Sequence, residues 1–190
     1  MKRCEWVPSN NKLYIDYHDK EWGVPIHDDN KIFEFLVLES AQAGLSWHTI
    51  LKKRENYRLA FDDFSPEKVA RFNNEKFLFL LQNKGIIRNK LKISAAINNA
   101  KLFLDIQSEF SSFDKYIWRF VDGTPKINKF HKIEEIPAKT KESEAMSKDL
   151  KQRGFKFLGP TICYAHMQAT GMVNDHIESC FRYKEIIDVY

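Results

Sequence analysis

Apolar side chains recur at helical spacing along most of this chain, and segments that alternate between apolar and polar residues in the manner of a strand are scarce. Several of the apolar segments follow a residue whose side chain can cap a helix. These predicted starts are Asp28 or Asp29, Ser46, Ser65, Asn74 and Ser112. A longer amphipathic segment runs from 88 to 110, whereas 124–138 has the weakest periodicity and is predicted to loop over the surface. The pattern therefore predicts an all-α fold in one compact domain.

Two more helices, separated by a turn between Gly154 and Gly159, are predicted within residues 141–171. Glycine lets such a turn bend tightly and brings bare amides close to a ligand. The second helix begins at this turn, so the positive end of its dipole lies there, and Lys156 adds a charge. The segment indicates a helix-hairpin-helix that contacts DNA phosphates. The alternative is an ordinary helix pair inside a bundle, with solvated lysines on its surface.

The composition changes this picture by excluding several classes of protein. Of 190 residues, 43% are hydrophobic and 14% are aromatic, which is ample for one sizeable core. No apolar run is long enough to span a membrane, and the first ten residues lack the apolar segment of a secretory signal. Three cysteines, an odd number, argue against a disulfide scaffold. We expect a cytoplasmic protein without membrane association, and the net charge of +4 mildly favours a nucleic-acid partner.

Two cysteines and two histidines stand at opposite ends of the chain, Cys4 and His18 near the start and His176 and Cys180 near the end. The last two lie on a predicted C-terminal helix, where the i, i+4 spacing places both side chains on one face. The four residue types match the Cys2His2 ligand set of a structural zinc site. Ordinary buried cysteines with scattered histidines are the alternative, and the spacing alone leaves both open.

A group of aromatic and acidic residues in the first quarter of the chain indicates a binding pocket. Tyr14 and Tyr17 each have a flat face that can stack on a base and a hydroxyl that can bond to its edge. Glu39 ends an apolar helix, where a carboxylate is costly unless it meets a hydrogen-bond donor or a positive charge. Core packing of the tyrosines and Trp47, together with an exposed Glu39, is the commoner arrangement and remains open.

Six segments of the chain resemble the bacterial 3-methyladenine DNA glycosylase I family, a divergent branch of the helix-hairpin-helix glycosylases. They are RCEWV, LYIDYHDKEWGVP, LESAQAGLSW, TILKKRENYR, GIIRNKLKI and LKQRGFKFLGPTICYAHMQATGMVNDH. The similarity is distributed from Lys2 to about Arg182. The resemblance therefore implies a single glycosylase domain over 1–183, with residues 184–190 as a C-terminal tail.

The resemblance also implies roles for individual residues. Structural zinc is assigned to Cys4, His18, His176 and Cys180. The pocket for the damaged base is assigned to Tyr14, Tyr17, Glu39 and Trp47, with Glu39 and Tyr17 as catalytic residues. Leu45, in the turn after Gly44, corresponds to the apolar wedge that fills the space left by an extruded nucleotide. The remaining DNA contacts are assigned to Gly154, Lys156 and Gly159.

One departure from most helix-hairpin-helix glycosylases limits the chemistry. Those enzymes place an essential aspartate shortly after the hairpin, where this chain has Asn174, with Asp175 adjacent. Residues 161–169 contain no lysine, so strand cleavage through a Schiff base is not expected. The resemblance thus implies a monofunctional hydrolase in base excision repair, and nothing in the sequence demands more than a monomer. It would extrude 3-methyladenine from alkylated double-stranded DNA and leave an abasic site.

Two other functions compete with this interpretation. A zinc-stapled DNA-binding module would use the hairpin but need no polar pocket, so Glu39 and Tyr17 would have no role. A small-molecule hydrolase with zinc in its active site would need three ligands and an open coordination position. Excision of 3-methylguanine as well is not decided by the sequence.

Overall fold

The computed structural model describes residues 1–189. Most of this range is helical, as predicted, and its strands are limited to one short parallel pair. The α-helices are α1 (Lys12–Lys20), α2 (Asp29–Gln42), α3 (Trp47–Ala60), α4 (Pro66–Val69), α5 (Asn74–Gln82), α6 (Lys90–Phe110), α7 (Phe113–Trp118), α8 (Lys141–Gln152), α9 (Pro160–Ala169) and α10 (Phe181–Val189). The 3-10 helices are η1 (Asp62–Phe64), η2 (Arg119–Val121) and η3 (Ile133–Glu135), and the strands are β1 (Lys126–Ile127) and β2 (Val173–Asn174). Within 1–189, no helix has the length and apolar character needed to cross a membrane.

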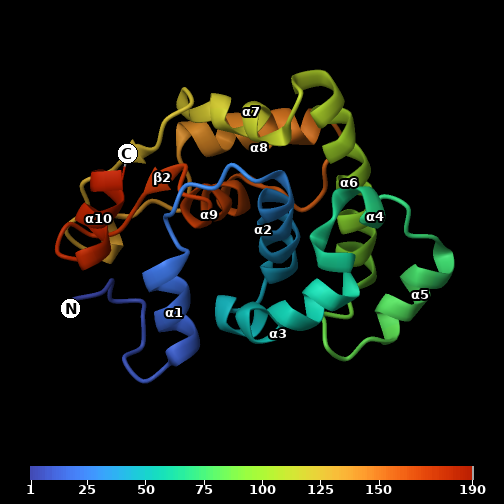
Figure 1. The fold of residues 1–190 in the computed structure, drawn as a ribbon, viewed down its shortest axis with the longest axis horizontal. Helices are drawn as coiled ribbons and strands as arrows, with labels where there is room; N and C mark the ends of the chain where they lie inside the picture. Colours follow the sequence, from blue (N-terminus) through green and yellow to red (C-terminus); the bar gives the residue numbers. More distant parts are fainter. Residues whose placement is uncertain (190) are drawn as a thin grey trace.

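Helix α2 lies at the centre of the molecule (Figure 1) and packs against α3, α6, α7 and α9. Every residue from 32 to 41 is buried, so this helix is enclosed on all sides instead of along one apolar stripe. Enclosure also buries two carboxylates of the helix. Glu34 is paired with Arg54 at 2.7 Å and with Arg58 at 3.0 Å. Glu39 has no such cationic partner among the described residues.

The predicted helix starts are confirmed at four positions, because each side chain accepts a hydrogen bond from the backbone N–H three residues later. These caps are Asp28, Ser46, Ser65 and Ser112. Helix α5 begins at Asn74, as predicted, and the side chain of the preceding residue, Asn73, caps it. The alternative cap Asp29 instead accepts hydrogen bonds from the backbone of Phe113 and Asp114, which ties the start of α2 to α7.

The segments next to the two ends of the chain both lie on the left of Figure 1. The Phe181 N–H donates to the Lys2 carbonyl at 2.9 Å, which joins them directly. The helix predicted over 176–180 is wrong, because this segment is a turn between β2 and α10. The Asn174 side chain accepts from the His176 N–H at 3.2 Å and so replaces a helical hydrogen bond. Helix α10 occupies most of the predicted tail, although Tyr190 lies outside the described residues.

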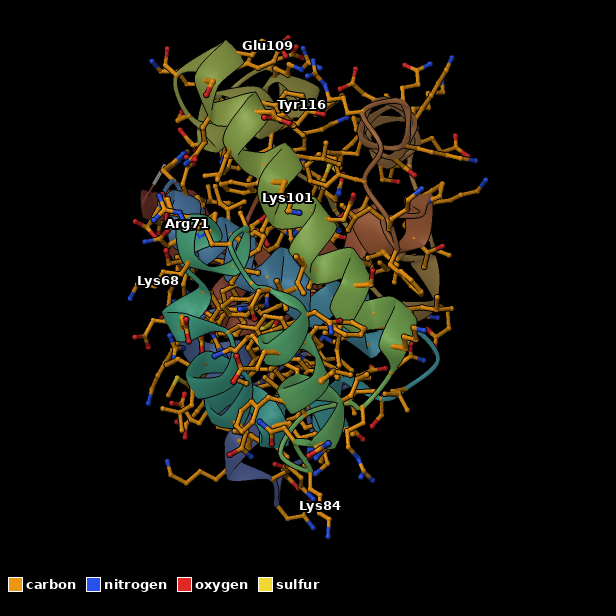
Figure 2. All side chains as sticks on the ribbon, turned by 90° about the vertical axis from the view of Figure 1, so that its right-hand side faces the viewer. Lys68, Arg71, Lys84, Lys101, Glu109 and Tyr116 are labelled. Atoms are coloured by element: carbon orange, nitrogen blue, oxygen red, sulfur yellow. The ribbon has the colours of Figure 1, made fainter. Side chains whose placement is uncertain are left out.

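Helices α8 and α9 pack on one another, and the turn predicted between them is held by α6. The amide of Asn99 donates to the Lys156 carbonyl and accepts from the Lys156 N–H, both at 2.9 Å. Figure 2 shows α6 crossing the molecule from Glu109 at the top towards Lys84 at the bottom. Glu109 accepts from Arg153 at 2.6 Å, so the end of α6 is tied to the end of α8. The turn is therefore fixed to a long and well-packed element.

The end of α9 brings the N-terminal segment against the rest of the fold. Gly171 has a φ of +70°, and a Cβ at this position would lie 2.2 Å from the Pro25 nitrogen. Only glycine permits so close an approach of two backbones. The Gly23 N–H donates to the Gln168 carbonyl at 3.0 Å and the Ile26 N–H to the Thr170 carbonyl at 3.0 Å. The segment between α1 and α2 is thereby held against the end of α9.

Candidate functional site

A cavity of about 370 Å³ opens where α1, α2, α3 and α9 meet the η3 segment. All four residues predicted for the base pocket line it, although they come from three separate helices: Tyr14, Tyr17, Glu39 and Trp47. The remaining lining residues were not identified from the sequence: Trp6, Trp22, Gln42, Ile133, Ile136, Ala165 and Gln168. They reach the cavity only through tertiary contacts, so neither local spacing nor periodicity could have indicated them.

Glu39 is the acidic group of the cavity and is only 3% exposed. Its Oε2 is buried and has no hydrogen-bond partner in the described chain. Burial raises the pKa of this carboxyl to about 8, since the charged form is poorly solvated there. A ligand that brings hydrogen-bond donors or positive charge would satisfy this oxygen and favour the carboxylate.

Aromatic rings form the walls around this carboxyl. Tyr17 is 4% exposed, and burial followed by the nearby Glu39 raises its pKa well above the ordinary value, so the phenol stays neutral. Its ring lies 5.5 Å from that of Trp47, and Trp6 contacts Tyr14 at 5.8 Å between ring centroids. The Trp47 Nε1 is buried without an acceptor among the residues described. Such walls suit a flat, electron-poor ring.

His48 packs against Tyr14, one of the rings that line the cavity. Its ring stacks on Tyr14 at 5.3 Å with an interplanar angle of 9°. Asn11 orients both residues, because its Oδ1 accepts from the Tyr14 N–H and its Nδ2 donates to His48 Nδ1 at 3.2 Å. The proton of a neutral His48 is therefore on Nε2. This stack limits the orientations open to Tyr14 at the cavity.

Asn174 and Asp175 lie outside the cavity lining. Asn174 is fully buried and bonds to backbone groups near the end of the chain, including the Tyr183 carbonyl at 3.2 Å. Asp175 is also buried and accepts from three side chains. Asn174, which we predicted to stand where most helix-hairpin-helix glycosylases have an aspartate, therefore has its amide engaged in structural hydrogen bonds.

The four predicted metal ligands converge although only His18, in α1, lies on a helix. Cys4, His18, His176 and Cys180 are buried, and their ligand atoms all lie within 4.8 Å of one another. His18 Nε2 lies 3.4 Å from Cys180 Sγ, and His176 Nδ1 lies 3.5 Å from both sulfur atoms. Tetrahedral zinc with ordinary Zn–N and Zn–S bonds places its ligand atoms about 3.5 Å apart. The donor set and its spacing therefore fit a four-coordinate metal ion.

Hydrogen bonds on the far side of each imidazole support this fit. His18 Nδ1 donates to the Asp19 carboxylate at 2.7 Å, and His176 Nε2 donates to the Trp22 carbonyl at 3.0 Å. Each bond places the ring proton away from the cluster and directs a lone pair towards it. The same tautomers are required of histidines that bind a metal.

The residues predicted to contact DNA occupy two turns. Leu45 is 41% exposed in the turn after α2, where Gly44 has a φ of +78°. In the second turn Gly154 has a φ of +96°. Gly159 is the cap residue directly before α9, and it has no side chain to accept a hydrogen bond from the start of the helix. The exposed Phe157 in this turn, with a φ of +58°, gave no signal in the sequence. Arg153, directly before Gly154, is paired with Glu109 and Asp149.

This chain is similar over nearly its whole length to known proteins of one family. A profile of the family described as methyladenine glycosylase matches residues 6–183. DNA-3-methyladenine glycosylase 1 of Escherichia coli is 51% identical over 183 residues, covering 96% of this chain and 97% of the relative. DNA-3-methyladenine glycosylase of Haemophilus influenzae is 47% identical over 178 residues, covering 94% and 96%.

Solved structures share the fold. A crystal structure of 3-methyladenine DNA glycosylase I superposes with a TM-score of 0.92 at 53% identity, covering 95% of this chain and 98% of that one. A variant of 3-methyladenine DNA glycosylase I in complex with 3-methyladenine has a TM-score of 0.91 at 38% identity, covering 95% and 97%. The Staphylococcus aureus protein, described for its recognition of 3-methyladenine, has a TM-score of 0.89 at 39% identity, covering 91% and 92%. The chain belongs to the methyladenine glycosylase family.

Proposed function

We propose that this protein hydrolyses the N-glycosidic bond of 3-methyladenine in alkylated double-stranded DNA and releases the free base. The single observation that carries the proposal is the unpartnered Glu39 oxygen inside an aromatic cavity. Relatives named for this activity support it, as does a neighbouring structure in complex with 3-methyladenine. A module that only binds DNA has no use for a buried carboxyl in an aromatic cavity.

The chemistry of the substrate explains why one carboxylate suffices. Methylation at N3 gives the base a positive charge and makes it a good leaving group, so a strong general acid is not required. Binding of the cationic base lowers the pKa of Glu39 and turns it into a carboxylate that accepts hydrogen bonds from the base edge. Tyr17 adds a polar contact. Unmodified adenine carries no charge and gains less from the same site.

The aromatic rings contribute to the same discrimination. Trp47 stacks on the extruded base, and Tyr14 also lines the cavity. Cation–π attraction between such faces and a cationic ring contributes about 1–2 kcal/mol when both are desolvated. Extrusion into the cavity costs a few kcal/mol of lost stacking and pairing. Leu45 offsets part of this cost by filling the space that the nucleotide leaves.

We assign the DNA contacts to the two turns. The segment 141–171 acts as a helix-hairpin-helix whose amides around Gly154 and Gly159 bind the phosphate backbone without sequence preference. Lys156 adds a charge. Water then attacks C1′ and leaves an abasic site. The described cavity lining includes no lysine, so no Schiff base forms and the DNA strand is not cleaved.

Zinc is the metal we propose for the Cys2His2 cluster, with a structural role. Four protein ligands leave no open position for water or substrate. Bound zinc would hold the first and last segments of the chain together. The proposal follows from the ligand spacing and from the two oriented imidazoles.

The test is release of free bases from methylated duplex DNA, resolved by chromatography. Wild-type protein is expected to release 3-methyladenine, and Glu39→Gln to release it on the order of 10²-fold more slowly. Glu55→Gln, at a side chain that is 79% exposed on α3, is the matched control and should keep the full rate. A folded wild-type protein that binds DNA but releases no base would overturn the proposal in favour of a binding module.

A further inference from the structure

We infer that Gln168 contacts the extruded base and selects adenine over guanine, and that Asp175 sets the direction of its amide. The inference rests on the proposed function and concerns the range of bases that the cavity accepts. Gln168 lines the cavity from α9, on a different helix from Glu39. Its side chain is the link between the cavity and a buried network of hydrogen bonds.

Asp175 is the centre of that network and is 1% exposed. Its Oδ2 accepts from the Tyr164 hydroxyl at 2.5 Å and from Gln168 Nε2 at 2.8 Å. Its Oδ1 accepts from Asn128 Nδ2 at 2.7 Å. Three donors therefore converge on one buried carboxylate, which satisfies it fully and fixes its position.

This arrangement determines which amide atom Gln168 offers to the cavity. A carboxylate only accepts hydrogen bonds, so the NH2 group of Gln168 must face Asp175. The amide is planar, and its oxygen then points away from the buried network. No described group donates to Gln168 Oε1, and this oxygen is not among the buried unpartnered atoms. The cavity wall thus presents a fixed acceptor.

A fixed acceptor distinguishes the two purines. Adenine carries an amino group at position 6, which is a donor, whereas guanine carries an oxygen there, which is an acceptor. Facing Gln168 Oε1, the amino group gains a hydrogen bond, and the guanine oxygen meets a second oxygen and loses its hydrogen bond to water. Sites built around a required donor reject substrates that lack it far more strongly than shape alone does. Gln168 is therefore expected to favour 3-methyladenine over 3-methylguanine.

The experiment measures release of both bases from one preparation of methylated duplex DNA. Gln168→Met keeps the length of the side chain but removes the acceptor, and should lower the rate for 3-methyladenine relative to 3-methylguanine by tenfold or more. Asp175→Asn lets the amide of residue 175 donate to Gln168 Oε1, so Gln168 turns its NH2 group to the cavity. This variant should shift the ratio in the same direction. Gln82→Met, on the exposed end of α5, is the control and should leave it unchanged.

A merely structural role makes a different prediction. If Gln168 only tied α9 to the segment around Asp175, both rates would fall together and their ratio would stay at the wild-type value, which would overturn the inference. Wild-type protein provides a second measurement should the variants not fold. Free 3-methyladenine should inhibit it at least tenfold more strongly than 3-methylhypoxanthine, which has an oxygen at position 6. Equal inhibition would overturn the inference. Failure of the wild type to release either base would instead reject the proposed function.

Discussion

The Lys92 ammonium donates a hydrogen bond to the Ala43 carbonyl at 2.5 Å, and a second to the Ala41 carbonyl at 2.8 Å. The side chain reaches from the first turn of α6 to the last carbonyls of α2, which have no partner within their own helix. Burial in this position lowers the pKa of Lys92. Since Ala43 precedes Gly44 and Leu45, the lysine anchors the turn that we assign to the DNA wedge.

Replacing Lys92 by methionine tests this anchor. The loss of two charge-assisted hydrogen bonds should destabilise the protein by about 1–3 kcal/mol. In the role that we propose for it, Leu45 is needed only where a base pair is opened, so base release should fall more on duplex than on single-stranded methylated DNA. The measurement compares both rates with those of Lys90→Met, an exposed neighbour on the same helix. Equal losses on the two substrates would show that Lys92 has no specific effect on the turn.

The sequence predicted best what local chemistry determines. Helix caps such as Ser46 and Ser112 depend on a single side chain and the next three residues, and they are confirmed. The prediction of a helix at 176–180 was wrong, because the Asn174 side chain accepts the hydrogen bond of the His176 N–H there. The stretch containing Tyr14 and Tyr17 was considered for its aromatic residues, and its helical form was not predicted.

The cavity was predictable only in part, because its lining residues come from segments that are far apart in the sequence. Its place at the end of an apolar helix drew attention to Glu39, whereas Trp47 was assigned to the cavity by the resemblance to a known family. Gln168 and Trp6 lie far apart along the chain, yet both line the cavity in the folded protein. No spacing rule covers such a contact. The sequence likewise shows the four residue types of the Cys2His2 set. The tautomers of its two histidines are set only in the folded chain, by hydrogen bonds to Asp19 and to the Trp22 carbonyl.

Removing one cluster cysteine tests the metal assignment. Cys180→Ala should lose stoichiometric zinc and lower Tm by more than about 10 °C, because the ends of the chain are no longer held together. Metal analysis and calorimetry provide the two readouts. Cys163→Ala is the control, since Cys163 is buried outside the cluster and its variant should retain zinc. A Cys180 variant with unchanged Tm but altered catalysis would point to zinc in an active site.

Glu39 makes the stability of the free protein depend on pH. Its pKa is about 8 in the folded protein against an ordinary value of 4.5. Between these values the folded state holds a proton that the unfolded state releases, so stability falls as pH rises through this window. Denaturant unfolding of Glu39→Gln should show a weaker loss from pH 5 to pH 8 than the wild type. Parallel curves for the two proteins would contradict a raised pKa for Glu39.

His166 makes a contribution of opposite sign. Both of its ring nitrogens are buried without hydrogen-bond partners among the described residues, and burial lowers its pKa from 6.5 to about 3. Below pH 6.5 the unfolded state binds a proton that the folded state does not, so stability falls as pH falls towards 3. His166→Phe keeps a planar ring and removes the two unsatisfied nitrogens. It should stabilise the protein by about 1–3 kcal/mol at pH 7 and reduce its sensitivity to acid.

Because these two groups act in opposite directions, their variants should move the pH of maximum stability in opposite directions. Glu39→Gln removes a loss on the alkaline side and should shift the maximum upward. His166→Phe removes a loss on the acid side and should shift it downward. Unfolding free energies measured from pH 4 to pH 9 for the wild type, both variants and the double variant would separate the two effects. A maximum that stays at the wild-type pH in both single variants would mean that other ionisable groups dominate the pH dependence.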